Sequence, residues 1–177
     1  MHNTAVVFYS RTGTTRQAAQ MLADRLDCPI FEIEDTVSRS GLWGDVRCVF
    51  DNVLQRHVPY RYTGPALADC ENLVVMAPVW VGHLAAPMRS FLKDNRKFQG
   101  GLAAVAVMAA RGGFRAAEEI AMAVGRPPHP VLVLLQREIA DGEALQDIND
   151  FATSLQSHAP ANPPQAPRPA WLSPNEA

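Results

Sequence analysis

The chain has 177 residues, 47% of them hydrophobic, which suffices for one domain with a substantial core. Its 16 basic and 18 acidic residues nearly balance, so no overall field favours binding to nucleic acid or to an anionic membrane. Cys28, Cys48 and Cys70 are far apart without a Cys-x-x-Cys pair, which argues against a disulfide framework and a zinc site. With no signal sequence and no apolar stretch near the ~20 residues of a membrane span, we expect a soluble, cytoplasmic protein that does not engage membranes.

Five apolar segments are predicted as strands, and their continuous character is typical of strands buried on both faces. In chain order they span residues 4–9, 29–33, 73–77, 102–108 and 131–135. Helix-periodic segments alternate with them. The apolar faces of these helices are predicted at Ala19, Leu22, Ala23 and Leu26; at Leu42, Val46, Val49, Phe50, Val53 and Leu54; at Met88, Phe91 and Leu92; at Ala117, Ile120, Ala121 and Val124; and at Leu145, Ile148, Ala152 and Leu155.

This alternation predicts an α/β fold with a doubly wound, five-stranded parallel sheet and helices on both faces. The expected strand order is 2-1-3-4-5, which places a switch point between the first and third strands. Residues 1–157 would form this domain. Residues 158–177 are rich in proline and are expected to form a polyproline-like tail.

The first predicted strand ends at a loop of hydroxyl side chains around one glycine, and a helix follows at once. The loop consists of Ser10, Arg11, Thr12, Gly13, Thr14 and Thr15. Backbone N–H groups at a helix N-terminus, aided by hydroxyl donors, suit a single phosphate. The three spaced glycines of the dinucleotide fingerprint and the Gly-Lys-Ser/Thr of the P-loop are absent. The alternative is an ordinary strand-to-helix turn capped by Ser and Thr.

Two further loops are predicted at the same edge, because ligands of such sheets lie beyond the carboxyl ends of the strands at the switch point. The second covers residues 78–83 and the third residues 109–114. Tyr60 and Tyr62 follow the second predicted helix, so we place them at the opposite, amino end of the sheet and expect a structural role.

Read together, the loops resemble those of the flavodoxin-like superfamily. Residues 9–15 are similar to the FMN phosphate loop of that family. Residues 77–92 resemble its second loop and helix, where a Pro-Val/Thr-aromatic-x-Gly turn packs on the isoalloxazine. Residues 109–114 stand where its third flavin loop is expected, and Gly41-Leu42-Trp43-Gly44 resembles small bacterial flavodoxin family proteins. The resemblance covers residues 4–157 and implies FMN as the cofactor.

Each loop suits a different part of FMN. Trp80 beside Gly82 offers a face for stacking, and Gly112-Gly113 would let backbone amides approach the pyrimidine edge, near which Arg111 is expected. His83 could bond the flavin or a substrate, or simply be solvated, and Arg16 could add charge. The resemblance implies cofactor binding by Ser10, Arg11, Thr12, Gly13, Thr14, Thr15, Pro78, Val79, Trp80, Val81, Gly82, His83, Ala110, Arg111, Gly112 and Gly113.

The electron carriers of the family that this chain resembles are acidic proteins. The three loops of this chain instead carry Arg11, Arg16 and Arg111 and no acidic residue. This favours an FMN-dependent oxidoreductase that takes hydride from NAD(P)H and reduces a quinone, a flavin or a similar small-molecule acceptor. The alternatives are a flavodoxin-type electron carrier, which would need a redox partner protein, and a flavin-free binding module on the same fold. No catalytic residue or metal ligand is assigned, and a homodimer is left open.

Overall fold

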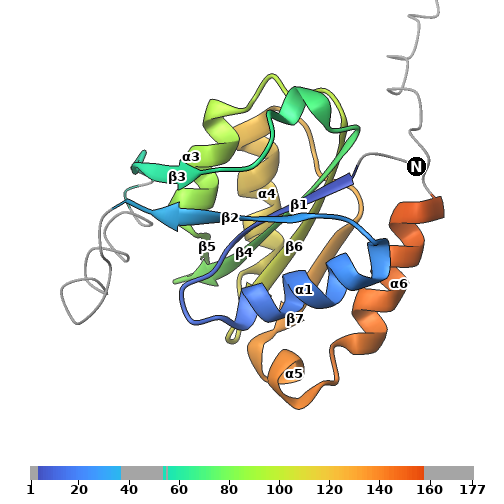
Figure 1. Ribbon diagram of the computed structural model, residues 1–177. Coiled ribbons are helices and arrows are strands. Elements are labelled where there is room, and N and C mark those ends of the chain that lie inside the picture. The colour runs from blue at the N-terminus through green and yellow to red at the C-terminus, as the bar shows by residue number, and fades with distance from the viewer. Residues whose placement is uncertain (1–3, 37–53, 55, 158–177) are drawn as a thin grey trace, which may run out of the picture.

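The computed structural model describes residues 4–36, 54 and 56–157. In chain order the elements are β1 (Thr4–Tyr9), α1 (Thr14–Leu26), β2 (Ile30–Asp35), β3 (Tyr60–Tyr62), the short 3-10 helix η1 (Leu67–Asp69), β4 (Asn72–Trp80), β5 (His83–Leu84), α3 (Ala86–Asp94), β6 (Gly101–Met108), α4 (Gly113–Val124), β7 (Val131–Leu135), α5 (Gln136–Asp141) and α6 (Leu145–Ser157) (Figure 1). The helix expected to begin near Ser40, Cys48 and the proline-rich tail lie outside these residues.

The described strands form one sheet in the order β3-β2-β1-β4-β6-β7, with β5 paired to β4. The strands β2, β1, β4, β6 and β7 are parallel, which confirms the predicted order 2-1-3-4-5. Two additions were not predicted. β3 pairs antiparallel with β2 at one edge, and β5 forms a hairpin with the end of β4.

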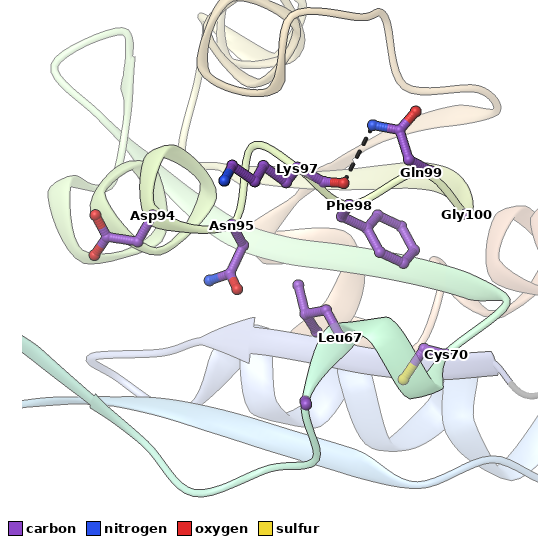
Figure 2. A pocket seen from close by; sticks show the side chains of 9 residues that line it. Leu67, Cys70, Asp94, Asn95, Lys97, Phe98, Gln99 and Gly100 are labelled. Atoms are coloured by element: carbon purple, nitrogen blue, oxygen red, sulfur yellow. Dashed lines mark hydrogen bonds between the residues drawn. The ribbon is translucent and has the colours of Figure 1, made fainter.

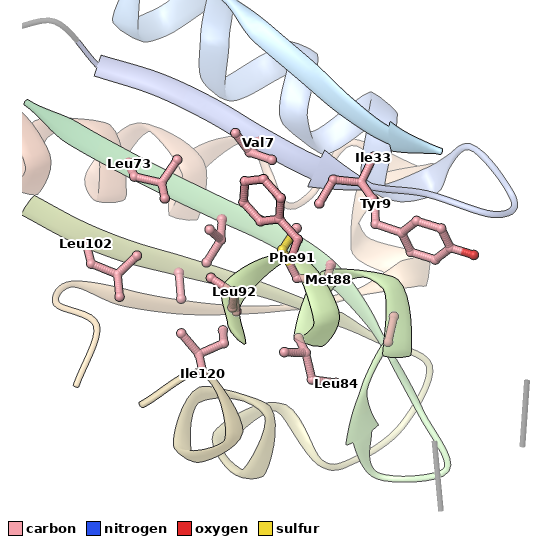
Figure 3. Close-up of a cluster of buried hydrophobic side chains, with 14 of the residues drawn as sticks. Val7, Tyr9, Ile33, Leu73, Leu84, Met88, Phe91, Leu92, Leu102 and Ile120 are labelled. Atoms are coloured by element: carbon pink, nitrogen blue, oxygen red, sulfur yellow. The ribbon is translucent and has the colours of Figure 1, made fainter. Parts of the chain in front are cut away.

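Both faces of the sheet are buried, which explains the continuous apolar runs of its central strands. Val7 and Tyr9 of β1 point into a cluster with α3 and α4, whereas Val6 and Phe8 point into a second cluster with α1, α5 and α6. Figure 3 shows the first cluster, in which Phe91 and Met88 of α3 pack over the strands. Each such side chain, once fully buried, stabilises the fold by roughly 1.5–3 kcal/mol.

Two expectations about individual elements need correction, and one helix was not predicted. The last predicted helix is α6, in which Ile148 and Ala152 are buried as expected, whereas α5 is an additional helix that ends at Gly142, where φ is a left-handed 80°. In α4 the predicted Ile120 is buried and Val124 packs partly buried against the core, but Ala116 and Glu119 complete the buried face in place of the predicted Ala117 and Ala121. The segment that includes Pro78 and Trp80, expected as a loop, continues β4.

The placement of Tyr60 and Tyr62 at the amino end of the sheet was wrong. Tyr60 pairs with Asp35 at the carboxyl end of β2, and Tyr62 pairs with Ile33. Both rings pack on Phe91 of α3 with centroids 5.8 and 4.9 Å away. Their expected structural role agrees with this packing.

Candidate functional site

The first loop connects the carboxyl end of β1 to α1 and has the shape expected of an anion cradle. Gly13 stands at the N-cap with a left-handed φ of 94°, and its N–H donates to Ser10 Oγ at 3.1 Å. The hydroxyl oxygens of Thr12 and Thr14 lie 3.4 Å apart at the surface, whereas Thr15 is buried. The first turn of α1 carries no acidic residue. The helix N-terminus therefore presents backbone N–H groups and hydroxyls with no competing carboxylate.

The two arginines of this region have different surroundings. Arg16 forms a forked salt bridge with Glu32 of β2, with Nη2 2.6 Å from Oε1. It is therefore tied to the neighbouring strand. Arg11 is exposed, and its guanidinium lies 6.0 Å from the centroid of the Trp80 ring, which is cation–π distance.

Tyr9 joins the first loop to the second. Its buried ring meets Trp80 edge to face at 5.6 Å and 78°, and its hydroxyl donates to Asp35 Oδ2 at 2.7 Å. Trp80, half-buried, is thereby held beside the hydroxyl loop. Trp80 and the hydroxyl loop, 66 positions apart counting from Thr14, thus lie in one neighbourhood at the carboxyl edge.

The second loop is a tight hairpin. Trp80 pairs with His83 and Val79 with Leu84, so the connection is the dipeptide Val81-Gly82. Both residues have positive φ, 52° and 76°, as two-residue hairpin turns require. Glycine accepts this conformation freely, but a β-branched valine does so only under strain. Val81 is also 62% exposed, so its side chain is held at the tip of the turn.

The third loop approaches the hairpin so closely that only glycine fits. A Cβ on Gly112 would lie 2.7 Å from the Cα of Gly82 and 3.1 Å from Val79 Cγ1. A Cβ on Gly113 would collide with Val133 of β7. The two glycines therefore let the hairpin, α4 and the sheet pack together.

A hollow of about 430 Å³ lies between the hairpin and the third loop. Its lining contains backbone, small apolar side chains and two arginines: Val79, Val81, Gly82, Ala109, Ala110, Arg111, Gly112 and Arg115. Six residues predicted from sequence to bind the cofactor thus line one space: Val79, Val81, Gly82, Ala110, Arg111 and Gly112. Arg115 was not predicted. Phe114, the last residue of the third loop as predicted, lies in the first turn of α4 and is 79% exposed.

The side chain of His83, which belongs to the second strand of the hairpin, is mostly buried. Its Nδ1 is 2.5 Å from Oε1 of Glu119, a buried residue of α4. The sequence did not predict Glu119 as part of this region. The signal available was an acidic residue between Ala116 and Ile120, on what proved to be the buried face of α4.

Two other hollows lie away from these loops. One, of about 530 Å³, is formed by residues before β4, the end of α3 and the residues before β6, and Figure 2 shows Leu67, Cys70 and Phe98 among its side chains. It lies at the amino ends of the strands, where ligands of such sheets are not expected. Burial, and secondarily Asp69, raises the pKa of the Cys70 thiol, which lowers the fraction present as the nucleophilic thiolate. The other, of about 540 Å³, lies between β3 and α3.

Solved structures share this architecture. A flavoprotein from Lactobacillus acidophilus, in complex with FMN, superposes with a TM-score of 0.63 over 80% of this chain and 98% of its own, at 14% identity. A flavodoxin from Streptococcus pneumoniae TIGR4 gives 0.57 over 88% and 99%, at 18% identity. A flavodoxin from Fusobacterium nucleatum, bound to flavin mononucleotide, gives 0.57 over 89% and 99%, at 12% identity.

No protein-family model matches the sequence, and no curated protein matches it at a significant level. Among the described helices, none has both the length and the apolar character needed to cross a bilayer. At identities this low the shared architecture establishes the fold and not the activity. Sheet order, hairpin and loop positions together show that this chain has the flavodoxin-like fold.

Proposed function

We propose that the protein binds one FMN without a covalent bond and uses it as an oxidoreductase that takes hydride from NAD(P)H. The acceptor would be a quinone, a flavin or a similar small molecule. The observation that carries this proposal is the meeting of three loops at one edge: a hydroxyl-lined helix N-terminus, a strained aromatic hairpin and a glycine loop around a hollow of about 430 Å³. Flavoproteins and flavodoxins with FMN share the fold.

The residues present fit the two chemically different ends of FMN. Ser10, Thr12 and Thr14 with the first N–H groups of α1 would hold the phosphate. The hollow bordered by Gly82 and Gly112 would take the flat ring. Trp80 does not line the hollow but directly precedes the turn, and it would supply the stacking aromatic. Bound FMN supplies a ring that accepts hydride and passes electrons on, while the protein contributes binding, orientation and charge.

The charge around the hollow favours an enzyme over an acidic shuttle. Arg11, Arg111 and Arg115 are exposed, and the three loops contain no acidic residue. Such a rim attracts an anionic nicotinamide nucleotide. A flavodoxin-type carrier is the second candidate, and it would be favoured by reduction through a ferredoxin-type reductase alone. A flavin-free module is the third, and it would be favoured by absence of any flavin binding.

The cofactor proposal is tested by titration of the purified apoprotein with FMN and riboflavin, followed by flavin fluorescence. We expect about one FMN per chain and weaker riboflavin binding, since riboflavin lacks the phosphate that the helix terminus holds. The double variant Thr12→Glu, Thr14→Glu should lose FMN binding but keep riboflavin binding, because its carboxylates repel only the phosphate. Thr153→Glu, on the exposed side of α6, is the matched control.

A wild-type protein that leaves FMN fluorescence unchanged would overturn the cofactor assignment. The donor is tested by anaerobic stopped-flow mixing of the FMN-loaded protein with NADH or NADPH. Bleaching of the flavin absorbance by either nucleotide supports the oxidoreductase. Bleaching only by a reductase protein supports the carrier.

A further inference from the structure

A cluster of buried, ionisable side chains lies beneath the hairpin and joins three elements. It consists of His83 from β5, Arg89 from α3 and Glu119 from α4, whose side chains are 12%, 3% and 3% exposed. We call it the Glu119 cluster. Arg115, at the rim of the hollow, approaches the same carboxylate to 3.8 Å from the solvent side.

The cluster holds both backbone polar groups of Leu84, the residue that ends the hairpin. Glu119 Oε2 accepts the Leu84 N–H at 3.0 Å, and Arg89 Nη1 donates to the Leu84 carbonyl at 3.1 Å. Glu119 Oε1 lies 2.5 Å from His83 Nδ1, and since a carboxylate only accepts, the imidazole proton is placed on Nδ1. Arg89 Nη1 is also 3.5 Å from Glu119 Oε2.

Such a cluster is costly for a fold, because taking charges out of water offsets most of their mutual attraction. Apolar residues of similar volume would stabilise α3 against α4 at least as well. What they could not do is fix both the N–H and the C=O of Leu84. Strained backbone persists only where its surroundings over-determine it, and the hairpin turn contains such a residue in Val81 at φ 52°.

We propose that Glu119 is a positioning residue for flavin binding. Through His83, Arg89 and Leu84 its carboxylate locks β5 to the two helices and so holds the Val81-Gly82 turn in the shape that receives the flavin ring. This role rests on the proposed function, in that the ring binds beside the turn. The lock on the hairpin itself exists with or without a cofactor.

Glu119→Gln keeps the size of the side chain but cannot accept at both atoms, because one becomes an amide donor facing His83 or Leu84. In the apoprotein we expect hydrogen exchange of the Leu84 amide, followed by NMR, to accelerate about tenfold or more, since a charge-assisted hydrogen bond is lost. Glu118→Gln, its exposed neighbour on α4, is the matched control and should leave the exchange rate unchanged.

Affinity supplies the second readout. If the turn of Glu119→Gln no longer holds the flavin ring, the affinities for FMN and for riboflavin should both fall about tenfold to a hundredfold. The ratio of the two affinities should stay unchanged. A general loss of structure would also weaken both flavins by the same factor, and it is distinguished by faster exchange of the core amides of β4, which a local release of the turn leaves unchanged. If Glu119→Gln does not fold, His83→Phe, which keeps a ring but removes the donor facing Glu119 Oε1, should show the same equal weakening to a smaller degree.

The proposal is overturned if Leu84 exchange in Glu119→Gln equals that in Glu118→Gln, or if the loss falls on FMN and not on riboflavin. A wild-type protein that binds neither flavin would remove the proposed function and the positioning role with it. Leu84 exchange in the apoprotein would still report whether the lock exists, so the two failures are distinguishable.

Discussion

Val81 is the residue at which local preference and tertiary structure most plainly disagree. A β-branched side chain with φ 52° is strained, and strain of this kind costs of the order of 1–3 kcal/mol. Burial does not offset it, because Val81 is 62% exposed. The hairpin register, fixed by the pairs Trp80 with His83 and Val79 with Leu84, leaves no other conformation for a two-residue turn.

Relief of this strain is directly measurable. We expect Val81→Asn to raise the free energy of unfolding by about 1 kcal/mol, because asparagine tolerates the left-handed region and little apolar burial is lost. Urea denaturation followed by circular dichroism gives the value. Val81→Ile, which keeps the branched Cβ, is the control and should match the wild type. Equal midpoints for all three proteins would mean that the turn is not strained in solution.

Glu119 shows at the same scale how far a pattern can mislead. Ala117, Ile120, Ala121 and Val124 have helical spacing, and only Ile120 among them is fully buried. The buried face of α4 includes Glu119 because its carboxylate contacts His83, 36 positions earlier in the chain, and accepts the Leu84 N–H, 35 positions earlier. Helical periodicity carries no information on partners so far apart in the sequence. It therefore predicts that Glu119 is exposed, although its carboxylate is buried.

At the scale of elements, the carboxyl end of β4 brings Trp80 into contact with residues of β1 and of the first loop. Trp80 is set edge to face against Tyr9 at 5.6 Å, and the Arg11 guanidinium lies over its ring at 6.0 Å. Any flat ring that stacks on Trp80 must share it with these neighbours. The end of β4, the hydroxyl loop and the hairpin are therefore coupled through Trp80.

Removal of the Trp80 ring should lower the affinity for FMN more than it lowers the stability of the fold. We expect Trp80→Ala to lower FMN affinity about tenfold to a hundredfold, as stacking on an aromatic side chain contributes roughly 1–3 kcal/mol in other systems. Trp80→Phe keeps an aromatic face and should stay within a few-fold of the wild type. Fluorescence titration measures both. An unchanged dissociation constant in the alanine variant would return Trp80 to a purely structural role beside Tyr9.

The elements that sequence predicted well are those whose residues are buried on both faces. β1, β4 and β6 are almost entirely apolar because helices cover them on either side, and with the apolar edge strand β7 their order could be inferred from alternation alone. β3 escaped prediction because three residues are too short for any periodicity and their pairing with β2 is non-local. β5 escaped for the same reason, as a two-residue strand defined by a turn.

The candidate site was predicted in part. The hydroxyl loop lies at the N-terminus of α1 as expected, and Val79, Val81, Gly82, Ala110, Arg111 and Gly112 line one hollow. That they bind FMN stays a prediction. The steric contact of Gly112 with the hairpin could not have been foreseen, because it depends on how two loops meet in space.

For the whole molecule, the ionisable groups with raised pKa values should make the free energy of unfolding decrease as the pH becomes alkaline. Burial is the main cause at Cys28, whose pKa rises to about 11, and at Tyr60 and Tyr62, whose pKa values rise to about 12. The nearby Asp27, Asp94 and Cys70 add to these shifts. Folding thus favours the neutral thiol and phenols, which the unfolded chain ionises more readily.

The sign follows from linkage. Each of these groups contributes stability that is complete below its unfolded pKa of 9.0 or 10.0 and is lost as pH rises toward the folded value. We therefore expect the melting temperature to fall progressively above about pH 9. Tyr60→Phe with Tyr62→Phe removes the two phenols that pack on Phe91 and should make this fall shallower. Melting curves of both proteins from pH 7 upward, with phenolate absorbance recorded in parallel, test this expectation. Identical slopes, or phenolate formation at ordinary tyrosine pH in the folded wild type, would show that the edge formed by β3 is open to water and does not hold these rings against α3.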